Sequence, residues 1–271
     1  MSGRLPGGTA WAVVTGASSG IGEELARGLA ARGHALLLVA RRAARLEKLA
    51  DELRAAHGGK VEVRVCDLGD RVGRADLRAE LAELEVGVLC ANAGFTTCGP
   101  LSEADASRER EEVEVNAVAL HDLVLTVLPG MLARRRGAIV VTGSTAGEQP
   151  VPTAATYSAT KAFANTFAAA LAQELRGTGV TCTLLAPGPV HTEFTAVGGI
   201  EGLEAHRWFA WKSAPFVAEA ALRGAERGRR VVVPGVMAKG QALAGRQLPR
   251  GAVFLLLRTV VLPRLRRARL A

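Results

Sequence analysis

The sequence predicts an α/β fold in which helices cover both faces of a doubly wound, seven-stranded parallel sheet. Short β-rich runs alternate with longer helical segments along the chain. These short runs are apolar throughout, which is typical of strands buried on both faces. We expect one domain, because no Pro/Gly/Ser-rich linker or internal repeat interrupts the alternation. The chain is 49% hydrophobic, enough for a single large core.

The predicted elements follow one another in a regular order. Strands are expected at residues 10–16, 35–40, 61–68, 86–94, 137–144, 180–188 and 229–235. Helices are expected at about 20–32, 43–56, up to 84, 103–135 and 154–176. Residues 189–214 and the segment after 235 fall outside the alternation. We therefore expect residues 1–235 to form the body of the domain, and 236–271 to be a basic, amphipathic helical extension of it.

Charge is distributed unevenly. From Arg223 onward the chain has twelve Lys/Arg and one acid, whereas the first 222 residues have 22 basic and 25 acidic side chains. The basic tail residues are interleaved with leucine and valine instead of polar or aromatic readers, so no nucleic-acid partner is expected. The cysteines show no CxxC pairing and the histidines no metal-ligand spacing, so we expect reduced thiols, no metal and a cytoplasmic chain. No signal peptide is expected at the N-terminus.

A glycine-rich turn, "TGASSGIG", joins the first predicted strand to the first helix. Gly16, Gly20 and Gly22 would let the backbone approach a pyrophosphate at the positive N-terminal end of that helix. The spacing is GxxxGxG, which departs from the common GxGxxG fingerprint. The same letters also fit G-x-S-x-G, the nucleophile elbow of serine hydrolases, which would make Ser18 a nucleophile. That elbow normally follows several strands, whereas this turn follows the first.

The chain has a single tyrosine, Tyr157, and Lys161 stands four residues after it. Positions i and i+4 share one face of a helix, so both side chains would point the same way. A free tyrosine has a pKa of about 10, which is high for proton exchange at neutral pH. A neighbouring ammonium favours the phenolate and lowers that pKa.

Four motifs in fixed order resemble the short-chain dehydrogenase/reductase family, whose fold is of the Rossmann type. They are "TGASSGIG" (15–22), "ANAG" (91–94), "GSTAG" (143–147) with "YSATK" (157–161), and "PGPVHT" (187–192). The resemblance covers about residues 10–235. It implies an NAD(P)-dependent oxidoreductase that transfers a hydride between nicotinamide and a carbonyl or secondary alcohol.

The resemblance also implies roles for individual residues. Tyr157 would exchange the proton, Lys161 would tune it and hold the nicotinamide ribose, and Ser144 would bind the substrate oxygen. Asn116 looks like the family's fourth catalytic member, which holds a water in a proton relay behind the lysine. The implied cofactor-binding residues are Gly16, Ser18, Ser19, Gly20, Ile21, Gly22, Arg41, Arg42, Asp67, Leu68, Asn92, Ala93, Gly94, Tyr157, Lys161, Pro187, Gly188, Val190 and Thr192.

NADP(H) is the predicted cofactor. An NAD site usually has an Asp or Glu at the end of the second strand, where it binds the adenosine ribose. Here that strand ends in "VARR", so Arg41 and Arg42 replace the acid. A guanidinium pairs with a 2′-phosphate that a carboxylate would repel. Arg41 is the first candidate for this contact.

The substrate is predicted to be a small lipophilic carbonyl or alcohol, such as a steroid-like, retinoid-like or long-chain oxo compound. The loop 189–214 contains Phe194 and Trp208, which we expect to cover an apolar substrate. The tail could contact an anionic membrane surface peripherally, the substrate entrance or a partner subunit. The family resemblance implies a homodimer or homotetramer.

Three alternatives remain at this point. The first is a 3-oxoacyl-carrier-protein reductase, for which the arginines of the tail would serve the carrier. The second is a non-catalytic dinucleotide sensor on the same fold, although such proteins commonly lose the tyrosine or lysine that this chain keeps. The third is the hydrolase that uses Ser18.

Overall fold

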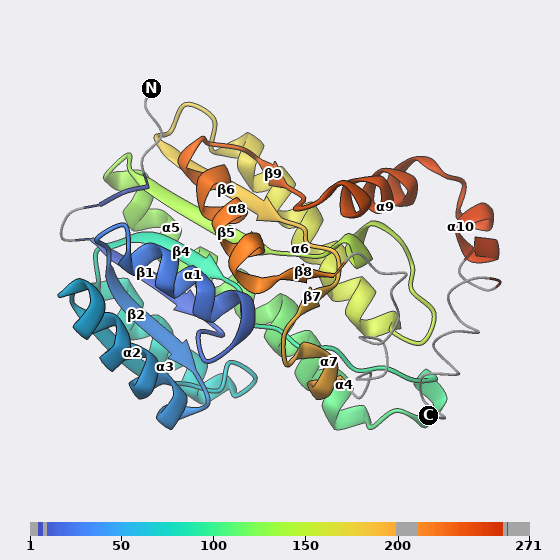
Figure 1. Cartoon of the computed structure of the whole chain (residues 1–271), viewed down its shortest axis with the longest axis horizontal. Coiled ribbons are helices and arrows are strands. Elements are labelled where there is room, and N and C mark those ends of the chain that lie inside the picture. Colours follow the sequence, from blue (N-terminus) through green and yellow to red (C-terminus); the bar gives the residue numbers. More distant parts are fainter. Residues whose placement is uncertain (1–4, 8–9, 199–210, 257–258, 260–271) are drawn as a thin grey trace.

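A seven-stranded parallel sheet lies between two layers of helices, which confirms the predicted fold class (Figure 1). The computed structural model describes residues 5–7, 10–198, 211–256 and 259. The sheet has the order β3-β2-β1-β4-β5-β6-β9. Its strands are β1 (Trp11–Thr15), β2 (Ala35–Ala40), β3 (Val61–Val65), β4 (Val86–Ala91), β5 (Gly137–Thr142), β6 (Val180–Leu185) and β9 (Val231–Val232).

The helices connect successive strands and extend beyond the last one. They are α1 (Gly20–Ala30), α2 (Ala43–His57), α3 (Arg71–Glu83), α4 (Ala106–Val113), α5 (Leu120–Ala133), α6 (Ala155–Glu174), α7 (Phe194–Val197), α8 (Ala214–Glu226), α9 (Val236–Gln247) and α10 (Arg250–Leu256). Shorter elements are η1 (Leu101–Glu103), η2 (Glu114–Ala119), η3 (Thr145–Glu148), β7 (Val190–His191) and β8 (Lys212–Ser213).

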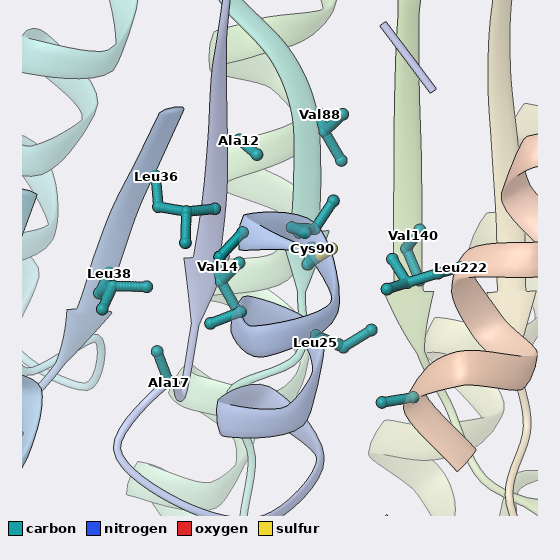
Figure 2. Close-up of a cluster of buried hydrophobic side chains, with 14 of the residues drawn as sticks. Ala12, Val14, Ala17, Leu25, Leu36, Leu38, Val88, Cys90, Val140 and Leu222 are labelled. Atoms are coloured by element: carbon teal, nitrogen blue, oxygen red, sulfur yellow. The ribbon is translucent and has the colours of Figure 1, made fainter. Parts of the chain in front are cut away.

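Apolar side chains alternate between the two faces of the sheet and form two cores. Ala12 and Val14 of β1 lie in one core with residues of α1, α2 and α8 (Figure 2). Val13 lies in the other, with residues of α3, α5 and α6. Because both faces are covered, the strand sequences need no polar alternation. Each fully buried leucine or valine contributes about 1.5–3 kcal/mol to this packing.

The structure differs from the expected boundaries in the stretch predicted as one helix, 103–135. There α4 passes into the wider π-helical turn η2 before α5 begins. Hydrogen-bond register inside a helix depends on packing, which periodicity does not reveal. The strand expected at 61–68 ends at Val65, because Asp67 instead accepts a hydrogen bond from the backbone N–H of Gly69 in a turn.

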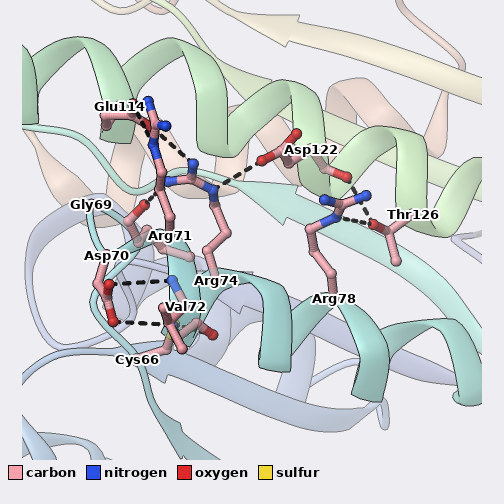
Figure 3. Close-up of polar contacts among 12 residues, drawn as sticks. Cys66, Gly69, Asp70, Arg71, Val72, Arg74, Arg78, Glu114, Asp122 and Thr126 are labelled. Atoms are coloured by element: carbon pink, nitrogen blue, oxygen red, sulfur yellow. Dashed lines mark hydrogen bonds and ion pairs between the residues drawn. The ribbon is translucent and has the colours of Figure 1, made fainter.

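A buried arginine joins α3 to η2 and α5 (Figure 3). Arg74 donates to Glu114 Oε2 at 2.8 Å, to Asp122 Oδ2 at 2.9 Å and to the carbonyl oxygen of Leu68 at 2.6 Å. Its side chain is 5% exposed. This charge is therefore desolvated, but each of its three nitrogen atoms donates a hydrogen bond, the condition under which a buried ion is tolerated.

The strand order places a crevice at the centre of the sheet. β1 pairs with β2 on one side and with β4 on the other, so the connections after β1 and β4 leave in opposite directions. In open α/β sheets ligands bind at such a switch point, outside the carboxyl ends of the strands. The predicted motifs follow β1, β4, β5 and β6, and they therefore meet at this edge.

Candidate active site

The glycine turn after β1 has the backbone geometry that requires glycine. Gly16 and Gly20 have φ values of +67° and +58°, in the left-handed region that L-side chains rarely adopt. A Cβ atom at Gly22 would lie 2.2 Å from the carbonyl oxygen of Gly16. The turn is therefore closed tightly under the first turn of α1, and Gly20 and Ile21 of that helical turn line the pocket.

The turn after β4 is tied to the end of β1. Thr15 Oγ1 accepts hydrogen bonds from the backbone N–H groups of Asn92 and Ala93, each at 3.0 Å. Asn92 Nδ2 donates to the carbonyl oxygen of Thr15 at 3.1 Å. These bonds fix the two turns against each other and make one rigid wall of the crevice.

Tyr157 and Lys161 lie on α6 and face the same pocket, as the spacing predicted. The Lys161 Nζ atom donates to the carbonyl oxygen of Thr142, at the end of β5, at 2.9 Å. It lies 5.8 Å from the centroid of the Tyr157 ring. On the other side, the Tyr157 ring lies 5.4 Å, centroid to centroid, from that of Phe194.

Ser144 lies just before η3 and is held beside Tyr157 by Asn165 of α6. Its side chain hydrogen-bonds Tyr157, and its Oγ accepts from the backbone N–H of Ala146 at 3.0 Å. Asn165 Oδ1 accepts from Ser144 N at 3.3 Å, and Asn165 Nδ2 donates to Ser144 O at 2.9 Å. The backbone of Ser144 is thus clamped by the residue one turn after Lys161.

Asn116 lies in η2, 2% exposed, behind the pocket wall. Its side chain donates to the carbonyl oxygen of Phe95 at 2.8 Å and to Thr160 Oγ1 at 3.1 Å, and it accepts from Phe95 N at 3.1 Å. A Cβ at Gly94 would lie 2.9 Å from Asn116 Oδ1 and 3.3 Å from Lys161 Nζ. Gly94 therefore lets the asparagine and the lysine approach each other.

The two arginines after β2 lie at the other end of the crevice. Arg42 donates from Nη2 to Ser18 Oγ at 3.0 Å and to Ser19 Oγ at 2.7 Å. Arg41 Nη1 lies 2.9 Å from Glu111 Oε1 and 3.7 Å from Asp67 Oδ2. Arg42 also pairs with Glu193, Nη1 to Oε2 at 2.7 Å. Both arginines are therefore paired with carboxylates, and Arg42 is in addition bonded to the glycine turn.

A pocket of about 540 Å³ connects these features. Two predicted residues of the described chain do not line it, and a third is not described. Gly22 lies beneath the turn, Asn116 lines a smaller cavity behind the wall, and Trp208 lies outside the described residues. The predicted residues that line the pocket are Gly16, Ser18, Ser19, Gly20, Ile21, Arg41, Arg42, Asp67, Leu68, Asn92, Ala93, Gly94, Ser144, Tyr157, Lys161, Pro187, Gly188, Val190, Thr192 and Phe194.

Sequence reasoning missed residues whose role depends on packing. Asn165 had a usable signal, because it continues the i, i+4 series of Tyr157 and Lys161 along α6. Gln241 of α9 also lines the pocket, although it lies in the predicted tail extension. Arg246 of α9 pairs with Glu148 at 2.7 Å, and Glu148 accepts from Asn165 Nδ2 at 2.9 Å. The start of the tail is therefore fastened to the substrate side of the site.

Burial shifts both titratable groups of the α6 pair. Withdrawal from water raises the pKa of the Tyr157 phenol, and the hydrogen bond with Ser144 lowers it in part. Burial lowers the pKa of Lys161 to about 8. The expected lowering of the Tyr157 pKa by Lys161 is not seen in this geometry, where the ammonium is bonded to Thr142 O.

A glycine turn at the sheet's switch point and a Ser–Tyr–Lys cluster in one pocket define an oxidoreductase that uses a dinucleotide. A family model described as short chain dehydrogenase matches residues 10–198. The chain therefore belongs to the short-chain dehydrogenase family, whose members use NAD(P).

Known relatives extend this comparison. The chain is 36% identical over 197 residues to a very-long-chain 3-oxoacyl-CoA reductase of Anas platyrhynchos, covering 71% of this chain and 63% of that protein. The chain spans between half and two thirds of the length of such curated relatives.

Solved structures are similar over most of the chain. A short-chain dehydrogenase from Sphingobium yanoikuyae in complex with NADPH is 32% identical with a TM-score of 0.80, covering 93% of this chain and 96% of that one. A bulky-bulky ketone specific alcohol dehydrogenase from Comamonas testosteroni is 28% identical with a TM-score of 0.76, covering 93% and 94%.

Proposed function

We propose that the protein is an NADP(H)-dependent carbonyl reductase whose substrate is a lipophilic oxo compound. The observation that carries the proposal is the convergence of Ser144, Tyr157 and Lys161 on one pocket next to the glycine turn. The cradle fits a dinucleotide, because Gly16 and Gly20 line the pocket with backbone alone, and the absence of a Cβ at Gly22 lets the first turn of α1 pack against Gly16. The nicotinamide, when bound, supplies or accepts the hydride.

The side chains supply the proton and the electrostatics. The Tyr157 hydroxyl donates its proton to the substrate oxygen as reduction proceeds, and the Ser144 hydroxyl donates a hydrogen bond to the same oxygen. Asn165 holds the backbone that carries Ser144, so the donor is preorganised. In this structure the Lys161 ammonium is bonded to the carbonyl oxygen of Thr142. We propose that it stabilises the phenolate once the proton has been transferred.

A proton path behind Lys161 is supported by a small cavity. It has about 10 Å³ available, close to the lower limit for one water, and Thr15, Asn116 and Thr142 are among its lining residues. We propose that Asn116 acts through a water placed there. This is the relay role that the family resemblance implied for Asn116.

The preference for NADPH rests on the basic end of the pocket. No carboxylate ends β2, and Arg42 is bonded to both serines of the glycine turn. Arg41 was the first candidate from sequence. Both arginines have a carboxylate partner, Glu193 for Arg42 and Glu111 for Arg41. The bonds to the glycine turn favour Arg42 as the principal partner of a 2′-phosphate, with Arg41 beside it.

Arg42→Ala is expected to raise the KM for NADPH about tenfold or more and leave the KM for NADH nearly unchanged. A charged hydrogen bond is worth about 1.5–3 kcal/mol, and 1.4 kcal/mol corresponds to a factor of ten. The measurement is steady-state kinetics with both nucleotides. Arg45→Ala, which removes an arginine paired with the same Glu193, is the control and should change neither value appreciably. Equal losses with both nucleotides would defeat the assignment.

A lipophilic substrate is supported by the apolar side chains around Tyr157. Phe95, Val151, Phe194 and Trp211 line the pocket. The named relatives reduce very-long-chain 3-oxoacyl-CoA, and a structural neighbour acts on bulky ketones. A purified-protein assay that follows NADPH consumption with long- and short-chain 3-oxoacyl-CoA, bulky ketones and 3-oxoacyl-carrier protein tests the proposal. A preference for the carrier protein would favour the first alternative function, and no turnover with any carbonyl would favour the sensor.

The hydrolase is disfavoured by the surroundings of Ser18. Its Oγ accepts hydrogen bonds from the Arg42 guanidinium, a group that cannot remove a proton. Ser18→Ala should therefore leave carbonyl reduction largely intact. Only the hydrolase hypothesis predicts that Ser18→Ala loses all enzymatic activity.

The helices that the family resemblance assigned to oligomerisation expose apolar side chains. On α5 and α6, Leu125 and Phe163 are 49% and 41% exposed, and Phe163 stacks on Phe167. We propose that this face pairs with a second copy in a homodimer or homotetramer.

The C-terminal segment has two parts with different proposed roles. We propose that α9 belongs to the same domain and borders the substrate entrance, because Gln241 lines the pocket and Arg246 pairs with Glu148. We propose that the part after Gln247 contacts a membrane surface from the cytoplasmic side. Phe254 and Leu255 of α10 are 44% and 63% exposed there, and arginines follow in the sequence.

Within the described chain, Ala106–Ala133 is long and apolar enough to cross a membrane by length and composition alone. Half of its most apolar window is buried inside the fold, and core helices of soluble proteins pass the same test. We therefore base the membrane proposal on the tail.

Truncation after Gln247 is expected to abolish co-sedimentation with anionic phosphatidylserine vesicles and to keep most reductase activity, because α9 remains in place. Removal of the whole segment from Val236 should in addition lower activity, since α9 is fastened to η3. Unchanged vesicle binding after the shorter truncation would exclude the tail as the contact.

A further inference from the structure

A buried carboxylate lies in the wall behind Lys161. Glu112 of α4 is 0% exposed. One carboxylate oxygen, Oε2, accepts from Thr97 N at 2.8 Å and from Thr97 Oγ1 at 2.5 Å. The other, Oε1, accepts from Asn116 Nδ2 at 3.5 Å. A carboxylate is costly to bury, so a fully enclosed one beside a reaction site calls for a function.

Glu112 is connected to the pocket through Asn116 and the segment after β4. Asn116 bonds both backbone groups of Phe95, while Glu112 bonds Thr97 two residues later. Together they hold the segment that includes Gly94, where the close approach of Asn116 and Lys161 occurs. The carboxylate thus supports the wall against which the lysine rests.

The charge of Glu112 also acts on the α6 pair. Among the described residues no carboxylate lies within ion-pair distance of Lys161, whose ammonium is bonded to a backbone carbonyl. The charge of Glu112 raises the pKa of Lys161, opposing burial, and it raises the pKa of Tyr157 as well. Both effects keep protons on the groups that carbonyl reduction needs.

We propose that Glu112 is a positioning residue for the reduction: its carboxylate fixes Asn116 and the 95–97 segment behind Lys161 and supplies the negative charge that balances the lysine ammonium. This assignment rests on the proposed reductase function. It adds to the Ser–Tyr–Lys cluster a group that touches neither substrate nor cofactor.

Other charged and titratable groups near Glu112 also affect the protonation of its carboxylate or of Tyr157. Burial raises the pKa of Glu112, and its hydrogen bonds with Thr97 lower it in part. On its own helix, Glu109 raises it further and is itself hydrogen-bonded by Thr156 of α6. Arg108 lies over the Phe95 ring and pairs with Glu111, away from Glu112. From the facing elements, Lys161 of α6 lowers the pKa of Glu112, and Cys98 contributes to the raised pKa of Tyr157.

The test exploits the single tyrosine of the chain. Glu112→Gln removes the charge and keeps the shape, so the pKa values of Lys161 and Tyr157 should both fall. The alkaline limb of the pH profile for kcat in NADPH-dependent reduction should then move about one unit toward lower pH. At a fixed pH on that limb, turnover should drop by up to about tenfold, with little change at pH 6.5.

A second measurement does not need activity. Tyrosinate absorbs in the near ultraviolet, so an alkaline titration of the purified protein reports Tyr157 directly, with Tyr157→Phe as the blank and circular dichroism as the check on folding. Glu112→Gln should show more tyrosinate than the unaltered protein at the same pH. This result separates failure of the Glu112 assignment from failure of the proposed reductase function.

Two further variants complete the experiment. Glu112→Asp keeps the charge and should restore most of the unaltered pH profile. Glu103→Gln removes an exposed glutamate of η1 and should leave both measurements unchanged. Superimposable kcat profiles and tyrosinate titrations for Glu112→Gln and the unaltered protein would overturn the assignment, as would an equal shift with Glu103→Gln.

Discussion

Tyr157→Phe is expected to lower kcat for carbonyl reduction by at least a factor of about 100, with the KM for NADPH nearly unchanged. The ring and its contact with Phe194 remain, whereas the hydroxyl that delivers the proton is lost. A positioned general acid contributes about 10²–10⁴ to the rate. Steady-state kinetics with a long-chain oxo substrate measure the effect.

Ser158→Ala is the matched control for Tyr157→Phe. It removes a hydroxyl from the next position of α6, which does not line the pocket. There the group donates to the carbonyl oxygen of Ala155 and accepts from Val151 N at 3.4 Å. We expect its kcat to stay within about twofold of the unaltered value, because this hydroxyl has no part in the proton transfer. Comparable turnover in the Tyr157→Phe protein would refute the proposed chemistry.

Arg74→Met is expected to lower the free energy of unfolding by about 3 kcal/mol. The change leaves Glu114, Asp122 and the carbonyl oxygen of Leu68 without their shared donor (Figure 3). Removing one member of a buried ionic network costs about 3–5 kcal/mol, and the partial exposure of both carboxylates places this case at the lower end. Denaturant unfolding measures the change, and the Tm should fall by roughly 6–10 °C.

Arg71→Met provides the comparison for Arg74→Met. Arg71 pairs with the same Glu114 at 2.8 Å, but its side chain is 81% exposed. An exposed ion pair contributes about 0–1 kcal/mol, so this variant should be nearly as stable as the unaltered protein. If both variants lost equal stability, burial would not be the source of the effect.

The layout of the fold was predictable because it depends on local pattern. The continuous apolar runs identified the seven strands, and their alternation with helices predicted the parallel sheet that the structure confirms. Element ends were less predictable. The chain 103–135 has the composition of one helix, and only packing reveals that its hydrogen bonding widens at η2.

In the candidate site, too, the residues set by local pattern were predictable from the sequence, and those set by packing were not. Tyr157 and Lys161 were predictable because a helical spacing brings them to one face, and the glycine turn because its φ values exclude most other residues. The burial of Glu112 and Arg74 was not predictable. A charged residue in a polar helix is expected to be exposed, and only the packing of the neighbouring helices buries these two. The place of α9 also depends on tertiary contact, since Gln241 and Arg246 connect it to the site across a large sequence separation.

The wide turn η2 has a consequence for how this enzyme can vary. A π-helical turn carries one residue more than a regular helix needs over the same length. Loss of that extra residue would make α4, η2 and α5 one regular helix. It would also rotate α4 by about 100° relative to α5. Helix α4, which carries Glu112, would then turn relative to α5. Insertions and deletions at this turn should therefore be far less tolerated than substitutions on the helix surface.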